Sequence, residues 1–108
     1  MKRRRRRELV PMSEESRKTK RKRITFYGWV QGVGFRYRAI HAAALVGATG
    51  WVRNNPDDSV TMEIQGTEEQ ISQVILMIER GTYVRIENME VKNLTEDPSE
   101  RGFTVKYS

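Results

Sequence analysis

The chain has 108 residues, with 20 Lys and Arg against 14 Asp and Glu, a single His and no Cys. This length allows one domain with a modest core, and the lack of cysteine excludes disulfides, thiolate metal sites and cysteine nucleophiles. No apolar run approaches the roughly 20 residues of a membrane span, and the basic N-terminus lacks the apolar centre of a signal peptide. We therefore expect a cytoplasmic protein without a membrane partner.

The positive charge is concentrated at the N-terminus. Residues 1–23 contain 12 basic and three acidic side chains and so carry +9, whereas residues 24–108 carry −3. A segment with five consecutive arginines and few apolar residues cannot bury enough surface to fold alone. We expect residues 1–22 to form a disordered basic tail and residues 23–108 to form the domain. The tail either contacts nucleic acid unspecifically or is a solvated appendage.

A glycine-rich loop follows the first predicted strand, which runs from Ile24 to Val30. In this loop Gly32 and Gly34 can adopt positive φ, so that successive N–H groups point inward and form a nest for an anion. A helix beginning near Phe35 would add its free N–H groups and the positive end of its dipole.

The position of Arg36 strengthens this interpretation. A cation at a helix N-terminus opposes the dipole by about 0.3–1 kcal/mol, and such local conflicts are expected mainly at functional sites. The side chain leans back toward the loop, where its planar guanidinium suits phosphate oxygens. The spacing alone leaves open a plain glycine turn followed by a surface arginine.

The next elements are a helix, two strands and a second helix. Apolar residues three and four apart predict a helix from Phe35 to Val46 that ends at Gly47. Strands are predicted over 49–54 and 59–65, and the turn residues between them make these strands a hairpin. Thr67 and Gln70 form a capping box at the start of the second helix, whose buried stripe contains Ile71, Val74, Ile75 and Ile78.

Two further strands complete the chain, one over 84–94 that is irregular around Asn88, and a short one over 103–107. The resulting order is βαββαβ with an extra short strand. This order predicts an α+β fold, a ferredoxin-like α/β sandwich in which an antiparallel sheet carries both helices on one face. Because this fold serves many functions, the function must come from the site.

The segment Gly28-Trp29-Val30-Gln31-Gly32-Val33-Gly34-Phe35-Arg36, followed by Gly50-Trp51-Val52-Arg53-Asn54, resembles the two signature segments of the acylphosphatases. The resemblance extends over residues 24–107. It implies hydrolysis of the carboxyl–phosphate bond of small acyl phosphates, without a metal, a cofactor or a covalent phosphoenzyme. By position, Arg36 would match the substrate-binding arginine of the family and Asn54 its water-positioning asparagine.

The chemistry of these residues agrees with that implication. The leaving carboxylate has a conjugate acid with a pKa of about 4, so no general acid is needed. The N–H groups from Gln31 to Phe35, which include Gly32, Val33 and Gly34, would bind the phosphate together with Arg36. Asn54 could hold a water in line, with the substrate phosphate accepting the proton.

Other candidate residues have simpler explanations. His41 is interpreted as an ordinary helical side chain, and Asp57 and Asp58 as turn residues instead of a metal site. We expect Trp29 and Trp51 to pack, with Trp29 also placed to border the substrate entrance.

Two positions depart from the family pattern. Asp58 stands where Gly is common, so we expect strain in the hairpin. Thr82 stands where the family often has proline, which affects the local loop shape and the preference for the acyl group.

Two other functions share this order of elements. An RNA-recognition module would stack bases on aromatic side chains of its first and third strands, but residues 60–64 contain none. An accessory domain of a hydrogenase-maturation protein is the second alternative, for which the chain is too short to contain the remainder. No pattern determines the oligomeric state, and a monomer is the default expectation.

Overall fold

The computed structural model describes residues 17–107. The disorder expected for the basic tail falls mainly on residues 1–16, which lie outside the described residues. Within the described range, no helix is long and apolar enough to cross a membrane.

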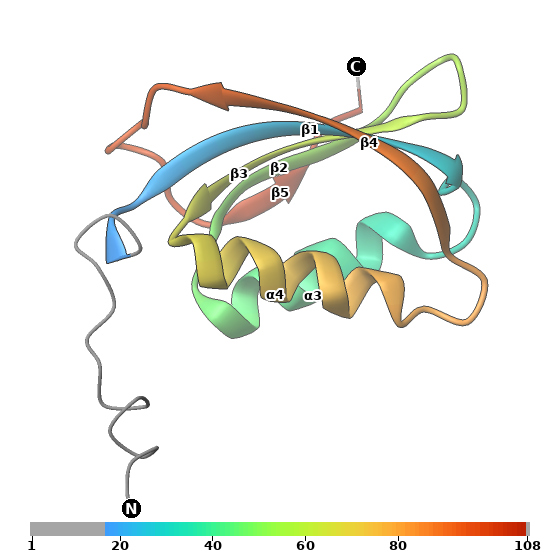
Figure 1. The fold of residues 1–108 in the computed structure, drawn as a ribbon, viewed down its shortest axis with the longest axis horizontal. Coiled ribbons are helices and arrows are strands. Elements are labelled where there is room, and N and C mark those ends of the chain that lie inside the picture. Colours follow the sequence, from blue (N-terminus) through green and yellow to red (C-terminus); the bar gives the residue numbers. More distant parts are fainter. Residues whose placement is uncertain (1–16, 108) are drawn as a thin grey trace, which may run out of the picture.

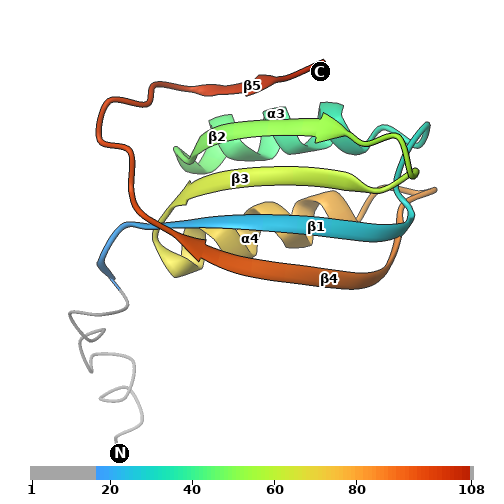
Figure 2. The ribbon, with the colours of Figure 1, turned by 90° about the horizontal axis from the view of Figure 1, so that it is seen from above.

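One five-stranded sheet carries two helices on a single face (Figure 1). The elements in chain order are β1 (Lys20–Trp29), α3 (Phe35–Val46), β2 (Thr49–Asn54), β3 (Val60–Gly66), α4 (Glu68–Glu79), β4 (Arg85–Leu94) and β5 (Phe103–Val105). The strands lie in the order β4-β1-β3-β2-β5 (Figure 2). The ferredoxin-like α+β fold predicted from the element order is confirmed.

The sheet differs from the expected antiparallel sheet at one edge, where β5 pairs parallel to β2. The pairs β1·β3, β1·β4 and β2·β3 are antiparallel. After β4 the chain reverses once and crosses to the opposite edge, so β5 runs against β4 and therefore along β2. The last strand is thus an edge addition to the βαββαβ unit, and the sheet is mixed.

Strand β1 begins earlier than the sequence indicates, at Lys20 and not at Arg23 or Ile24. Its first residues pair with the end of β3, where Lys20 lies opposite Gly66, and with the end of β4, where Arg21 lies opposite Leu94. Ladder hydrogen bonds to two neighbours form whatever the side chains are. The basic composition of this stretch therefore does not prevent it from joining the sheet.

A β-bulge between Tyr27 and Gly28 interrupts the pairing of β1 with β4, opposite Asn88, and confirms the irregularity predicted there. Gly28 has φ 129°, and a Cβ at this position would lie 2.3 Å from the carbonyl oxygen of Arg85. Only glycine fits this approach. The extra residue of the bulge, Glu87, belongs to β4, and Gly28 opposite it lies shortly before the glycine-rich loop.

The core lies between the sheet and the two helices. Its largest buried side chains come from alternate positions of β1 and β3 and from the facing helix stripes: Ile24, Phe26, Phe35, Met62, Ile64 and Ile78. The rings of Phe26 and Phe35 lie 4.9 Å apart between centroids. Since Phe35 is the first residue of α3, its burial fixes where the helix begins relative to the sheet.

The helix ends follow the predicted capping. The Thr67 side chain accepts from the N–H of Gln70, and the Gln70 side chain accepts from the N–H of Thr67, which forms the capping box of α4. Gly47 adopts φ 84° and ends α3. Both predictions are confirmed.

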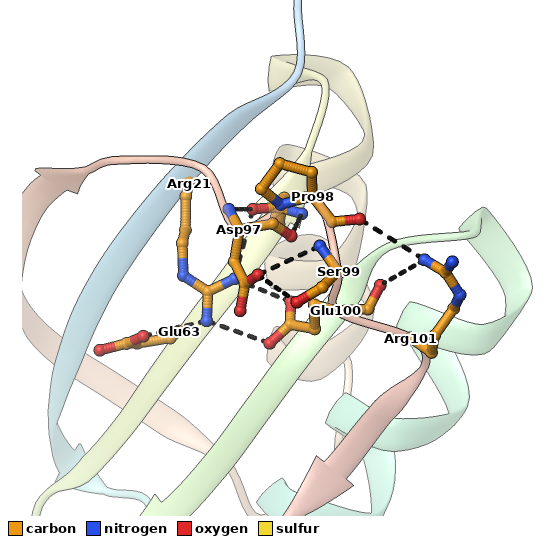
Figure 3. Close-up of polar contacts among 8 residues, drawn as sticks. Arg21, Glu63, Asp97, Pro98, Ser99, Glu100 and Arg101 are labelled. Atoms are coloured by element: carbon orange, nitrogen blue, oxygen red, sulfur yellow. Dashed lines mark hydrogen bonds and ion pairs between the residues drawn. The ribbon is translucent and has the colours of Figure 1, made fainter.

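Between β4 and β5 the chain crosses the end of the sheet, and Arg21 fixes this crossing segment (residues 95–102) in place (Figure 3). The Arg21 guanidinium donates two hydrogen bonds to Glu100, at 2.7 and 3.1 Å, and one to Glu63 at 3.0 Å. The Gln65 amide exchanges hydrogen bonds with the backbone of Asp97. This network lies near the start of β1, at the opposite end of that strand from the glycine-rich loop.

Candidate active site

The loop between β1 and α3 has the backbone conformation that the glycines predict. Gly32 has φ 72°, and Gly34, the N-cap of α3, has φ 85°. An added Cβ at either glycine would meet nothing within 4 Å. These glycines are therefore required by the backbone conformation and not by crowding, and the space over them is open.

The loop amides remain available to a ligand. Within the part of the chain that the structure describes, the N–H groups of residues 32–36 donate to no acceptor, and the first bond onto the loop is from Arg38 N to Gly34 O at 3.0 Å. No described side chain caps α3, and its first turn contains no acidic residue. Unpaired N–H groups at a helix N-terminus form an anion-binding feature.

Gln31 holds the loop against the β2–β3 hairpin through its side chain. Its Nε2 donates to the carbonyl oxygens of Asn55 and Ser59, both at 2.8 Å. Asn55 in turn donates to the hydroxyls of Ser59 and Thr61, at 3.0 and 2.8 Å. The glycine loop and the end of β2 are thereby fixed relative to each other, although they are far apart in sequence.

A pocket of about 320 Å³ lies where the loop, the N-terminus of α3, the end of β2 and the end of the chain meet. Its lining includes Gly32, Gly34, Phe35, Arg36 and Asn54, five of the seven residues proposed from the sequence. The other two, Gln31 and Val33, do not line it. Val33 packs against the core, and the Gln31 side chain is occupied by the hairpin.

Arg36 and Asn54 both line this pocket. Among the described residues, Arg36 has no ion-pair partner and the buried Oδ1 of Asn54 has no hydrogen-bond donor. The guanidinium carbon of Arg36 lies 5.6 Å from the centre of the Tyr107 ring. Leaving a buried acceptor unpaired costs about 1–3 kcal/mol, which a hydrogen bond from a bound donor would relieve.

The acylphosphatase family model matches residues 22–105. The chain belongs to the acylphosphatase family. An acylphosphatase from Oceanobacillus iheyensis is 41% identical over 87 residues, which cover 79% of this chain and 96% of that relative. One from Geobacillus thermodenitrificans is 39% identical over 89 residues, covering 82% and 95%. The resemblance seen in residues 28–36 and 50–54 is confirmed, and with it the enzyme class, an acylphosphatase hydrolase.

Solved structures agree with this membership. The crystal structure of an acylphosphatase from Bacillus subtilis superposes with a TM-score of 0.74 at 27% identity, covering 82% of this chain and 99% of that one. Full-length HypF, solved with phosphate and nucleotide bound, superposes with a TM-score of 0.72 at 26% identity, but the match covers only 12% of that protein. The chain thus corresponds to a stand-alone acylphosphatase in extent and to a small part of HypF.

Other polar residues of this acylphosphatase family member are engaged in local structure. The His41 ring lies against Tyr37, with 4.2 Å between centroids. Asp57 accepts hydrogen bonds from the hydroxyl and N–H of Ser59, and these bonds hold the pKa of its carboxyl below the usual range. Among the described residues no group of three or more His, Asp or Glu is placed to hold a metal.

The two tryptophans differ from each other. Trp51 lies on the face of the sheet opposite the helices, between the cationic side chains of Arg53 and Lys106, and so packs as expected. Trp29 is 67% exposed whereas the neighbouring Val30 is buried, as expected for residues that alternate between the two faces of a strand. The expectation that Trp29 packs is wrong. It lines hollows beside the loop and not the pocket of Arg36.

Five residues that line the pocket were not among the site residues proposed from the sequence: Val30, Tyr37, Ile40, Val105 and Tyr107. Ile40 was detectable in principle, since it lies one helical turn after Arg36 and shares its face. Val105 and Tyr107 reach the pocket only because β5 pairs parallel to β2, which the sequence does not specify.

Proposed function

We propose that the protein hydrolyses the carboxyl–phosphate bond of acyl phosphates, with the phosphate bound by Arg36 and the amides of residues 31–35 and the attacking water positioned by Asn54. The observation that carries this proposal is that one pocket is lined by three kinds of group without a partner among the described residues. They are the N–H groups of the loop, the Arg36 guanidinium and the buried Oδ1 of Asn54.

The loop and Arg36 would neutralise the phosphoryl group. Phosphoryl transfer spreads negative charge over the three equatorial oxygens, and preorganised N–H donors stabilise that charge without reorganising. The guanidinium fork supplies two parallel donors to adjacent phosphate oxygens. Gln31 contributes through its backbone N–H and, by holding the hairpin, keeps the loop close to Asn54.

Asn54 would orient the nucleophile. Its Oδ1 accepts a hydrogen bond from a water whose oxygen attacks phosphorus, while the bond from phosphorus to the carboxyl oxygen breaks on the opposite side. The electron pair of that bond leaves with the carboxylate, and the proton of the water passes to a phosphate oxygen. An uncharged amide is sufficient because the carboxylate is a good leaving group. The products are a carboxylate and inorganic phosphate.

The first test is hydrolysis of benzoyl phosphate by the full chain in the presence of EDTA. We expect turnover that the chelator does not reduce. Asn54→Ala should lower kcat about 10²- to 10³-fold with little change in KM, since the water is held mainly in the transition state. Asn93→Ala, which removes an exposed asparagine of β4, is the matched control and should behave as wild type. Turnover unaffected by Asn54→Ala would refute the water-positioning role.

For the N-terminal segment we propose a basic tail that is dispensable for hydrolysis and contacts nucleic acid only unspecifically, on a monomeric cytoplasmic enzyme. Deleting residues 1–16 should leave kcat/KM unchanged. Any binding of the full chain to a single-stranded oligonucleotide should weaken steeply with salt and disappear on deletion. Binding that persists in the truncated protein would contradict this role for the tail.

A further inference from the structure

A separate hollow, of about 230 Å³, lies between α3 and α4, the two helices that cover one face of the sheet (Figure 1). We call it the interhelical hollow, and its lining includes Tyr37, Arg38, His41, Leu45, Met77 and Arg80. Neither Arg36 nor Asn54 lines it, and Tyr37 alone is shared with the pocket of Arg36. The interhelical hollow is therefore separate from the groups proposed to bind phosphate and water.

An exposed stripe of large side chains runs along the α3 side of the hollow. Tyr37, His41 and Leu45 follow one another at intervals of four residues and so share one face of the helix. Tyr37 is 67% and Leu45 75% exposed, and the Tyr37 and His41 rings lie 4.2 Å apart between centroids. On the α4 side, Met77 packs against the core from a partly buried position. Clustered exposed apolar side chains mark interaction sites, and methionine adapts its shape to a bound helix.

The charge of the interhelical hollow is positive. Arg38 and Arg80 line it, and no carboxylate does so among the described residues. The Arg38 guanidinium is held in place because its Nε and Nη2 donate to the carbonyl oxygen of Met77, at 3.0 and 2.7 Å. Its Nη1 donates to no described residue and remains available to a ligand. Residues 24–108 carry −3 overall, so the hollow is a basic region on an acidic domain, and complementary charge on a partner would be negative.

The size of the hollow favours a macromolecule over a small ligand. Sites for small molecules span about 300–1,000 Å³ and enclose most of the ligand, whereas this hollow has about 230 Å³ and keeps Tyr37 and Leu45 exposed. It would accommodate a few side chains of a larger partner. An amphipathic helix provides them, since its apolar side chains recur three and four residues apart and lie in a groove between two helices.

The basic charge also disfavours two other occupants. In a symmetric contact between two copies the same surface faces itself, so the Arg38 and Arg80 side chains of both copies would be brought together. The N-terminal segment is strongly basic and would be repelled in the same way. A partner with carboxylates avoids this repulsion.

We propose that the interhelical hollow is a docking site for an acidic amphipathic helix of a partner protein. Apolar side chains of that helix enter the hollow between Leu45 and Met77, and its carboxylates pair with Arg38 and Arg80. This binding surface goes beyond the proposed hydrolase function and does not depend on it.

The probe is a fluorescein-labelled peptide of Leu, Glu and Ala, about 15 residues long so that it can form a helix, with its leucines on one helical face. A scrambled peptide of the same composition measures the binding that comes only from attraction to the basic N-terminal segment. Fluorescence anisotropy with the full chain gives both affinities. We expect the amphipathic peptide to bind about 10-fold more tightly than the scrambled one, because only its leucines can enter the hollow together.

Two variants locate the site. Leu45→Ser and Arg80→Gln should each weaken binding of the amphipathic peptide about 5- to 10-fold, as expected for central interface residues. Leu76→Ser removes an exposed leucine of α4 that does not line the hollow, and Arg85→Gln removes an exposed arginine of β4. Both matched controls should bind as wild type does. Urea unfolding of all four variants verifies that they are folded.

Three results would overturn the proposal. Equal binding of the two peptides would show that only charge attracts them. A preference for the amphipathic peptide that survives both Leu45→Ser and Arg80→Gln would place the binding elsewhere on the molecule. Co-sedimentation with phosphatidylglycerol vesicles that is lost in Leu45→Ser, without a preference between the peptides, would assign the surface to an anionic membrane. Because all these measurements report binding, a failure of the hydrolase function would leave their interpretation unchanged.

Discussion

Arg21 and Arg36 lie at opposite ends of β1 and have opposite environments. Arg21 is 7% exposed, and its guanidinium donates to Glu63, Gln65 and Glu100. Arg36 has no carboxylate partner among the described residues, although it stands at a helix N-terminus where a cation is unfavourable. At the start of β1, which we call the paired end, the charges of Arg21, Glu63 and Glu100 are paired. At the pocket, which we call the unpaired end, the loop N–H groups, Arg36 and the Asn54 Oδ1 have no partner among the described residues.

Under the proposed function, this difference places the stabilising ion pairs and the catalytic residues at opposite ends of β1. The paired end fixes residues 95–102 and so directs β5 to the edge of β2, where its Val105 lines the pocket. The unpaired end retains local conflicts among the described residues, which the anion and the water of the proposed function would relieve. Substitutions at the two ends should therefore affect different measurements.

The largest expected effect is on catalysis at the unpaired end. Arg36→Ala should lower kcat/KM for benzoyl phosphate about 10³-fold, because Arg36 is the only cation among the described residues that line the pocket. The free energy of unfolding should stay the same or rise by up to about 1 kcal/mol, since an unfavourable charge at the start of α3 is lost. Steady-state kinetics and urea unfolding measure the two quantities.

Arg85→Ala, which removes an exposed arginine of β4, is the control for this experiment. It should change neither quantity. A large loss of stability in Arg36→Ala would show that Arg36 has a structural partner and would contradict the contrast with Arg21.

At the paired end the expected effect is on stability. Arg21→Ala leaves Glu63 and Glu100 without their shared partner and should lower the free energy of unfolding by about 2–4 kcal/mol, measured by urea denaturation. Arg23→Ala should cost less, about 1 kcal/mol, because the Arg23 side chain is 47% exposed and, among the described residues, forms an ion pair with Glu63 alone. Neither variant should change kcat/KM per folded molecule. Activity lost by the folded Arg21→Ala protein would show that the two ends are coupled.

The paired end should also make stability depend on pH. Burial alone would raise the pKa of Glu63, but hydrogen bonds from Arg23 and Arg21 and their charges outweigh it and lower this pKa below the ordinary value of 4.5. A depressed folded-state pKa contributes stability above the unfolded pKa, and this contribution is lost as pH falls through the folded value.

The protein should therefore lose stability progressively below about pH 4.5. Glu63→Gln should be less stable at pH 7 and should show a shallower loss on acidification, measured by urea unfolding at a series of pH values. An equally steep loss in Glu63→Gln would assign the acid sensitivity to other carboxylates.

Local patterns predicted most of the fold. The capping box of Thr67 and Gln70, the end of α3 at Gly47 and the irregularity of the strand around Asn88 were predicted from neighbouring residues, and all three are confirmed. The early start of β1 and the parallel pairing of β5 were missed because both depend on contacts between distant segments. In the same way, the burial of Arg21 depends on Glu63 and Glu100, 42 and 79 residues away.

In the candidate site, too, the residues placed by local sequence could be predicted, and those placed by distant segments could not. Backbone features of residues 32–36 could be read from the two glycines, and a family resemblance supplied the roles proposed for Arg36 and Asn54. Val105 and Tyr107 could not be found, because they reach the pocket only through β5. Trp29 was expected to pack, but it falls on the other face of the strand from the buried Phe26 and Val30 and is exposed.

The smallest predicted effect concerns Asp58, where the expected strain in the hairpin can be measured. Asp58 has φ 74° and is the only residue other than glycine with positive φ among the described residues. Asp58→Gly should raise the free energy of unfolding by up to about 1 kcal/mol, because it removes the Cβ that is crowded in the left-handed conformation. The greater flexibility of glycine in the unfolded chain should offset part of this gain. Asp57→Gly should instead destabilise, because it removes the acceptor for the hydroxyl and N–H of Ser59.

Both variants should keep the wild-type kcat for benzoyl phosphate, because Gln31 is held by the carbonyl oxygens of Asn55 and Ser59 and not by either aspartate. A lower kcat in Asp58→Gly would show that the strained turn helps to position Asn54, so that strain at the pocket end of the sheet would serve catalysis as well.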